Sequence, residues 1–173
     1  MKMIEKYLNI LKKICNKIEN PGKKTVQKLM YLIEANGVEL DLNYRIHYFG
    51  PYSPDLDNAL HVLQNYDYIQ IDTRQQTHKI SIKDKSFSRN EVFTLEEEKN
   101  IDFVIDNFAH KSAYDLEGIT TVHYVACTLM EKFGDIGDEK IIDEVLSIKG
   151  TKFKPEQLNQ YLEILKRYNL IEQ

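Results

Sequence analysis

LDNALHVLQNYDYI, residues 56–69, matches LNQYLEILKRYNLI, residues 158–171, without a gap. The shared apolar positions are Leu56, Leu60, Leu63, Tyr66 and Ile69 in the first copy and Leu158, Leu162, Leu165, Tyr168 and Ile171 in the second. Their spacing predicts one buried ridge of leucine and tyrosine along a helix in each copy, followed by a polar residue that ends the helix before another apolar one. Such self-similarity indicates one structural unit that is used twice. A helix that runs straight into a strand is how a winged helix-turn-helix begins its wing.

The first half, residues 1–83, has the pattern of a winged helix with a small β-hairpin. Apolar stripes predict helices over residues 3–19 and 24–35, and the aromatic, alternating run 44–49 predicts a strand. Residues 50–55 are interpreted as a turn that starts a third helix, with Ser53 as N-cap and Pro54 at the first helical position. Residues 68–73 and 78–82 then form the hairpin, which is the wing.

The second half, residues 84–173, is predicted to be helical and to repeat part of the first. A polar connection over 84–93 leads to a capping box at Thr94 and Glu97, and Ser112, Asp138 and Pro155 mark the starts of three further helices. No linker rich in serine, glycine or proline separates the halves. We therefore expect an α+β fold that is mainly α, with the two halves packed as one compact unit.

The composition is that of an ordinary globular protein. Of the 173 residues, 42% are hydrophobic and 29% are charged, and no window holds 18 consecutive apolar residues. Charges at Lys2, Glu5 and Lys6 occupy the place where a signal peptide has an apolar run. We expect a cytoplasmic protein without a membrane segment, in which Cys15 and Cys127 are buried as small hydrophobic groups.

Positive charge is concentrated near the N-terminus. The chain has a net charge of −4, yet residues 1–28 carry eight lysines against two glutamates, a net charge of +6. Lys13, Lys17, Lys23 and Lys24 therefore form a candidate patch for anions or nucleic acid. The simpler alternative, which we favour, is the solvated face of an amphipathic helix.

A winged helix raises the question of DNA binding. The helix in the recognition position, residues 53–66, has Asp55 and Asp57 and no lysine or arginine. Phosphate neutralisation supplies most of the nonspecific affinity of DNA-binding proteins, so this helix would be repelled by the duplex. Any nucleic-acid binding would depend on the lysines near the N-terminus instead.

Signals for metal binding or catalysis are weak. His123 and Cys127 are the only helical pair with ligand spacing, and a packed histidine is the favoured interpretation. Ser53 lies in Gly-Pro-Tyr-Ser rather than in a Gly-x-Ser-x-Gly nucleophile elbow. We therefore expect no metal, no cofactor, no catalytic residue and no enzymatic activity.

Aromatic residues cluster around the Pro51 turn. Tyr44, Tyr48, Phe49 and Tyr52 fall within nine residues, and an alternating strand must turn some of these rings outward. Exposed tyrosines on a rigid turn are typical of protein–protein contacts. The alternative, that Tyr48 and Tyr52 only wedge the strand against the third helix, stays open.

Two segments resemble a known family. Lys28-Leu29-Met30-Tyr31-Leu32, followed by Tyr48-Phe49-Gly50-Pro51-Tyr52-Ser53 leading into Leu56 and Leu60, resembles the Panacea domain of SocA-like antitoxins, with the uncharacterised bacterial proteins of the YwgA type as the closer branch. The resemblance extends to the C-terminal run and implies an antitoxin-like or adaptor-like function. Members neutralise a toxin by direct contact, and one relative is a proteolytic adaptor.

These observations together predict a non-enzymatic module that binds a protein partner, either a toxin or a protease or other target. The predicted contact residues are Tyr48, Gly50, Pro51 and Tyr52, with Asp57 and His61 on the exposed side of the third helix. A winged-helix DNA-binding regulator is the alternative. A phage-encoded counter-defence protein is a third interpretation, and it would share the mechanism of occluding a partner surface.

Overall fold

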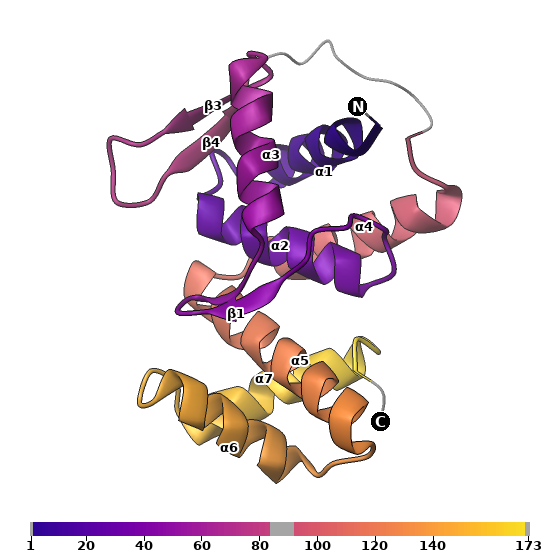
Figure 1. Ribbon diagram of the computed structural model, residues 1–173, viewed down its shortest axis with the longest axis vertical. Helices are drawn as coiled ribbons and strands as arrows, with labels where there is room; N and C mark the ends of the chain where they lie inside the picture. The colour runs from indigo at the N-terminus through magenta and orange to yellow at the C-terminus, as the bar shows by residue number, and fades with distance from the viewer. Residues whose placement is uncertain (1, 84–91, 172–173) are drawn as a thin grey trace.

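The computed structural model describes residues 2–83 and 92–171, and within these ranges the chain forms seven helices and four short strands (Figure 1). In chain order they are α1 (Lys2–Lys17), α2 (Lys23–Ala35), β1 (Arg45–His47), β2 (Gly50–Tyr52), α3 (Pro54–Asn65), β3 (Ile69–Asp72), β4 (Lys79–Ile82), α4 (Leu95–Phe108), α5 (Ala113–Phe133), α6 (Asp138–Lys149) and α7 (Pro155–Arg167). The prediction of an α+β fold that is mainly α is confirmed.

The elements gather in two parts (Figure 1). Helices α1 to α4 and the β3–β4 hairpin lie in one part, and α5, α6 and α7 lie in the other, with β1 and β2 between them. Helix α4 packs on α1 and α2, and α5 packs on both α6 and α7 and reaches back to α2 and β2. The predicted division at residues 83 and 84 stays a prediction, and most of the predicted connection, residues 84–91, lies outside the described residues.

The predicted wing is a two-stranded antiparallel sheet. Strand β3 pairs with β4 in the register Ile69 to Ile82 and Ile71 to Ile80. A bridge between Gly22 and Lys79 ties the second strand to the start of α2. The order of three helices followed by a hairpin agrees with the predicted pattern, while its identity as a winged helix stays a prediction.

Helix α2 lies at the centre of the molecule. Eight consecutive residues, from Val26 to Ile33, are buried, because α1, α4, α5 and β2 contact it from several sides. A helix that is covered all round needs an apolar surface all round. The run Leu29–Ile33 provides it, while Gln27 and Lys28 are polar exceptions.

The repeated segments end in the same backbone motif. The residue after the shared tyrosine is Asp67 in the first copy and Asn169 in the second. Each has a left-handed backbone, with φ of 59° and 54° respectively. The next amide, of Tyr68 or Leu170, donates to a carbonyl five residues back, at 3.0 or 2.9 Å. This pattern satisfies the last carbonyls of a helix. The predicted helix ends are therefore confirmed.

The surroundings of the two copies differ beyond the shared leucines, all of which are buried. Tyr66 is 70% exposed, whereas Tyr168 packs edge-on against Phe103 and Phe108 with ring centroids 5.5 Å apart. The interpretation of Tyr66 as part of a buried ridge is therefore wrong. The first copy continues into β3, while Leu170 and Ile171 are buried without entering a strand.

Local capping chemistry matches the sequence in most places. Ser53 accepts a hydrogen bond from the Leu56 amide, Thr94 and Glu97 form the capping box, and Ser112 caps α5. The N-cap of α6 is Gly137 rather than Asp138, which is the first helical residue. The expected burial of both cysteines is also wrong, because Cys15 is half-buried and Cys127 is exposed.

Candidate functional site

The aromatic segment forms a β-hairpin. Strands β1 and β2 pair in the register Arg45 to Tyr52 and His47 to Gly50, so Gly50–Tyr52 is a strand rather than the predicted turn. The turn itself consists of Tyr48 and Phe49, which we call the hairpin tip. Their rings meet edge to face at 4.9 Å, and 75% of Tyr48 and 37% of Phe49 remain exposed.

Two polar residues of α2 form hydrogen bonds with the second strand and with the residue that follows it. The side-chain amide of Gln27 donates to the Ser53 carbonyl and accepts from the Ser53 amide, at 2.9 and 3.0 Å. The amino group of Lys28 donates to the Pro51 carbonyl. Gln27, Lys28, Pro51 and Ser53 are all buried, so these bonds are shielded from water.

Gly50 allows the hairpin to approach α5 closely. Its φ is +84°, and a Cβ placed there would lie 2.8 Å from Thr121 Oγ1 and 3.4 Å from the Glu117 carbonyl oxygen. Any side chain would therefore meet both a strained backbone and a steric clash. The backbone conformation and the close packing on α5 therefore explain the glycine at this position, and its predicted contact with a partner stays a prediction.

The predicted contact residues Pro51 and Tyr52 lie on the inner side of the hairpin. Pro51 is buried and Tyr52 is half-buried. Burial, together with a hydrogen bond to the Asp57 carboxylate, raises the pKa of Tyr52 to about 12. Of the predicted tyrosines, Tyr48 is thus the one whose ring is mostly open to solvent.

A buried carboxylate joins the hairpin tip to the far end of α6. Lys149 donates to Glu117 Oε1 at 2.8 Å and to the Tyr48 carbonyl at 2.6 Å, and Lys152 donates to both Glu117 oxygens at 2.7 and 2.8 Å. We call Lys28, Lys149 and Lys152 around Glu117 the lysine cluster. Burial raises the pKa of Glu117, but the hydrogen bonds from the two lysines more than offset this and hold the pKa below its usual range.

Two ammonium groups also lie beside the rings of the hairpin tip. Lys24 Nζ lies 3.3 Å from the centroid of the Phe49 ring, and Lys152 Nζ lies 5.2 Å from the same centroid and 5.8 Å from that of Tyr48. All three distances are within the range of cation–π attraction. The exposed tip is therefore an aromatic surface with positive charge at its edge.

Asp57 and His61 lie on α3, as predicted, but in different settings. Asp57 forms an ion pair with Lys23 and accepts from Tyr52, so it links α3 to α2 and to the hairpin. His61 is exposed one turn further along the same helix. The structure thus brings Asp57 to the base of the hairpin and leaves His61 on the helix surface.

The four predicted patch lysines lie in two settings. Lys13 contacts Glu98 and Asp102 of α4 at 2.6 and 2.7 Å, and Lys17 contacts Asp106 at 2.7 Å. Lys23 and Lys24 lie instead at the start of α2, beside the hairpin. Much of the positive charge of α1 is therefore matched by the acidic side of α4.

His123 is a packed histidine. It is buried, with Nδ1 at 2.7 Å from the Tyr31 hydroxyl and Nε2 at 3.0 Å from the Leu170 carbonyl. Because a carbonyl only accepts, Nε2 carries the proton and Nδ1 accepts from Tyr31. Burial lowers the pKa of His123 to about 4, so the ring is neutral at pH 7. Its neighbour Cys127 has its sulfur 3.6 Å from Nε2.

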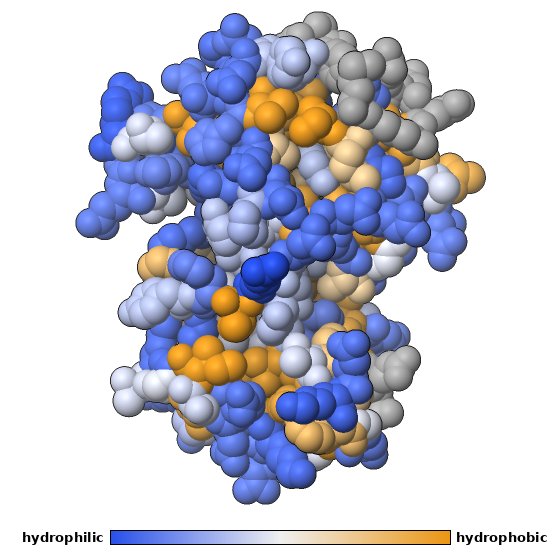
Figure 2. Space-filling view, in the orientation of Figure 1, coloured by the Kyte–Doolittle hydropathy of each residue, from blue (hydrophilic) through white to orange (hydrophobic). Residues whose placement is uncertain are grey.

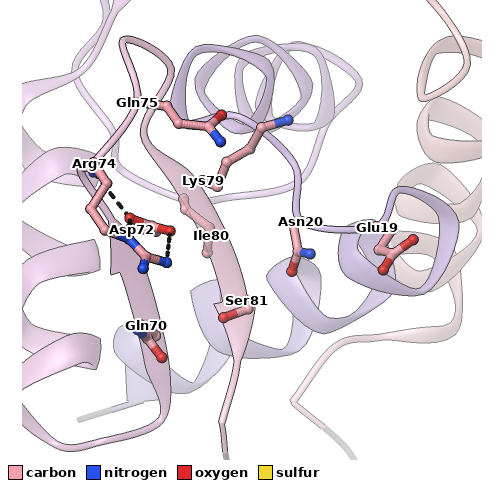
Figure 3. A pocket seen from close by; sticks show the side chains of 9 residues that line it. All are labelled: Glu19, Asn20, Gln70, Asp72, Arg74, Gln75, Lys79, Ile80 and Ser81. Carbon is pink, nitrogen blue, oxygen red and sulfur yellow. Dashed lines mark hydrogen bonds and ion pairs between the residues drawn. The ribbon is translucent and has the colours of Figure 1, made fainter.

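A separate cavity of about 440 Å³ lies beside the β3–β4 hairpin (Figure 3). Arg74 and Asp72 pair with each other there at 2.6 Å, and Figure 3 shows Glu19 and Asn20 across the opening, away from this pair. The ionisable groups do not converge on one point. In residues 2–83 and 92–171, no group of three His, Cys, Asp or Glu side chains is placed to hold a metal ion.

Apolar side chains gather in several groups on one face of the molecule. Figure 2 shows them separated by hydrophilic residues over both parts of the molecule on the face that it draws. None of the helices in the described ranges is long and apolar enough to cross a membrane.

Comparison with known proteins identifies the segment that builds this hairpin. Residues 26–123 match the family model described as antitoxin SocA-like, Panacea domain. The chain belongs to this family. It is also 23% identical to the uncharacterised protein YwgA of Bacillus subtilis (strain 168) over 175 aligned residues, which cover 95% of this chain and 99% of YwgA. The resemblance read from the sequence is confirmed.

The residues that match the Panacea domain include only part of the site. Gln27, Lys28, Glu117 and the whole β1–β2 hairpin lie within the matched residues. Lys149 and Lys152 lie beyond them, at the end of α6 and just after it. The lysine cluster therefore joins the Panacea domain to the C-terminal helices.

Sequence reasoning did not select the lysine cluster. Lys28 gave a local signal, because it interrupts the buried surface of a helix that is otherwise apolar. Glu117 gave a similar signal within the apolar α5. Lys149 and Lys152 gave none, since a lysine near the end of a helix is ordinarily solvated.

Proposed function

We propose that this Panacea-domain protein is a non-enzymatic, antitoxin-like module that neutralises or adapts a partner protein by direct contact. The observation that carries this proposal is the hairpin tip, where two exposed aromatic rings sit on a two-residue turn that is anchored from three helices. Gln27 and Lys28 of α2, Glu117 of α5 and Lys149 of α6 provide the anchors.

The anchoring favours binding because it fixes the turn in advance. Aromatic side chains are common among the residues that contribute most to an interface, and a rigid turn loses little freedom when it binds. The Tyr48 carbonyl is held by Lys149 while its ring stays 75% exposed. The ring is thus available without a rearrangement of the backbone.

The charge beside the tip indicates the chemistry of the partner surface. Lys24 and Lys152 lie next to the rings, so an apolar depression edged by carboxylates would complement them. The partner would be inactivated or redirected because the tip covers part of its surface. Within the site, the ionisable groups of Glu117, Lys149 and Lys152 bind one another, which supports a structural rather than a catalytic role.

The experiment places a photo-cross-linking phenylalanine derivative at position 48, and in a separate protein at position 66. Tyr66 is the matched control, because it is a tyrosine with 70% exposure at the far end of α3. We expect one protein to be cross-linked from position 48 in the native host and not from position 66. That protein is then purified for direct titration with the full chain.

The titration compares Tyr48→Ala, Phe49→Ala and Tyr66→Ala. Loss of a central aromatic contact costs about 2 kcal/mol or more, so we expect at least about 30-fold weaker binding for a tip variant and little change for Tyr66→Ala. Equal affinities for Tyr48→Ala and the unaltered chain, with both proteins folded by circular dichroism, would place the interface elsewhere.

A further inference from the structure

A cavity of about 370 Å³ lies behind the hairpin tip. Its walls come from three segments, namely the first two turns of α2, the β1–β2 hairpin and the loop between β3 and β4. Cavities of this size hold small organic ligands in many proteins. This cavity is distinct from the exposed surface of Tyr48, which does not line it.

Positive charge in the cavity is not balanced. Lys23, Lys24 and Lys28 line it, and neither aspartate nor glutamate does. Lys23 is paired with Asp57. Within residues 2–83 and 92–171, Lys24 and Lys28 have no ion pair with a carboxylate. Glu117 acts on Lys28 at longer range but is already paired with Lys149 and Lys152, so the cavity walls carry about two uncompensated charges.

Lys28 is the most informative of these residues because it is only 3% exposed. An ammonium group has three hydrogen-bond donors. The described part of the chain provides one acceptor, the Pro51 carbonyl. Burial lowers the pKa of Lys28 to about 8, and an anion in the cavity would offset that effect. The group is thus built into the wall of the cavity with donor capacity left.

The remaining walls suit a flat group. Phe49 and Tyr52 contribute aromatic rings, and the His47 ring lies 5.6 Å from that of Tyr52. Gln27, Gln76, Thr77 and His78 add polar groups at the edge. The start of α2 adds the positive end of a 13-residue helix.

We propose that this cavity binds a small phosphate monoester that carries a planar ring, the chemistry of a free nucleoside monophosphate. A phosphate monoester has a charge of about −1.5 to −2 at pH 7, which matches the two uncompensated ammonium groups better than a single carboxylate does. The phosphate binds between Lys24 and Lys28, and the ring lies against Tyr52 and the hairpin. This site goes beyond the proposed contact with a protein partner and does not depend on it.

The test is isothermal titration of the full chain with uridine monophosphate, phenyl phosphate, inorganic phosphate and uridine. We expect both monoesters to bind, inorganic phosphate to bind more weakly and uridine not to bind. Lys24→Gln removes one charge from an exposed position and should weaken the binding of both monoesters by at least about tenfold. Lys17→Gln removes an exposed lysine of α1 that is paired with Asp106 of α4, and it should leave the affinity for both monoesters unchanged.

Three results would overturn the proposal. One is the absence of saturable binding of either monoester at millimolar concentration. Another is an equal loss of affinity in Lys24→Gln and Lys17→Gln. The third is binding of a phosphorylated single-stranded oligonucleotide without binding of the mononucleotide, which would assign the lysines to nucleic acid. Phosphate binding that persists in Tyr48→Ala separates this site from the proposed protein contact.

Discussion

Replacing Gly50 with alanine tests whether close packing on α5 holds the hairpin tip. A Cβ at this position would lie 2.8 Å from Thr121 Oγ1, on a backbone with φ of +84°. The left-handed backbone costs an alanine about 1–2 kcal/mol, and overpacking of a close contact costs about 1–3 kcal/mol more. We therefore expect Gly50→Ala to lower the free energy of unfolding by about 2–5 kcal/mol, measured by urea denaturation.

Gly37 provides the matched control for the backbone contribution. Its φ is +89°, and the nearest atom to an added Cβ is Asn100 Nδ2 at an ordinary 3.6 Å. Gly37→Ala should therefore cost only about 1–2 kcal/mol. A second test adds Thr121→Ala, which removes the clashing hydroxyl and should reduce the cost of Gly50→Ala. Equal costs at the two glycines, or strict additivity of Gly50→Ala and Thr121→Ala, would refute the reasoning.

Two further predictions concern the buried ionisable groups. Burial lowers the pKa of His123 from 6.5 to about 4, so the stability that depends on its neutral ring is complete above pH 6.5 and is lost as the pH falls toward 4. Between about pH 7 and pH 4.5 the free energy of unfolding of the unaltered chain should therefore fall by about 2 kcal/mol more than that of His123→Gln. Urea denaturation measures both, and an equal change in the two proteins over this pH range would contradict the prediction. Glu117→Gln leaves the Lys149 ammonium buried without its carboxylate and should cost about 3–5 kcal/mol of unfolding free energy. The half-exposed Glu98→Gln should cost at most about 1 kcal/mol, and similar costs for the two variants would argue against the lysine cluster as the anchor.

The parts of the fold that were predictable from the sequence depend on local chemistry. Ser53, Thr94 and Ser112 cap the helices that follow them, because each side chain bonds an amide three residues on. The leucine pattern of the repeat likewise identified the buried faces of α3 and α7. These features need no knowledge of the rest of the chain.

The errors have non-local causes. Gly50–Tyr52 looked like a turn because glycine and proline are adjacent, yet pairing with β1 and packing on α2 and α5 make it a strand. Tyr66 occupies the same place in its segment as Tyr168, but its ring lies only beside that of Tyr68 among the described residues and stays 70% exposed, whereas Phe103 and Phe108 pack on Tyr168. Local patterns did not contain this information.

The candidate site was predictable in part. The aromatic motif pointed to the hairpin, and the structure places Tyr48 at its exposed tip. The lysine cluster was missed because Lys28, Glu117 and Lys149 come from three helices and meet only after folding. A single charged residue in an apolar helix, such as Lys28, is the local signal of such a cluster.

The bond from Lys149 to the Tyr48 carbonyl spans 101 residues of sequence. A fragment limited to residues 26–123 would keep every amino acid of the loop, with Gln27, Lys28 and Glu117, and lose the cation that holds the Tyr48 carbonyl. Grafting that fragment onto a different scaffold would therefore transfer the base of the loop and leave its outermost turn less rigid. Engineers who want a new specificity can vary Tyr48, whose ring is mostly exposed, provided that the end of α6 is kept in the transplanted protein.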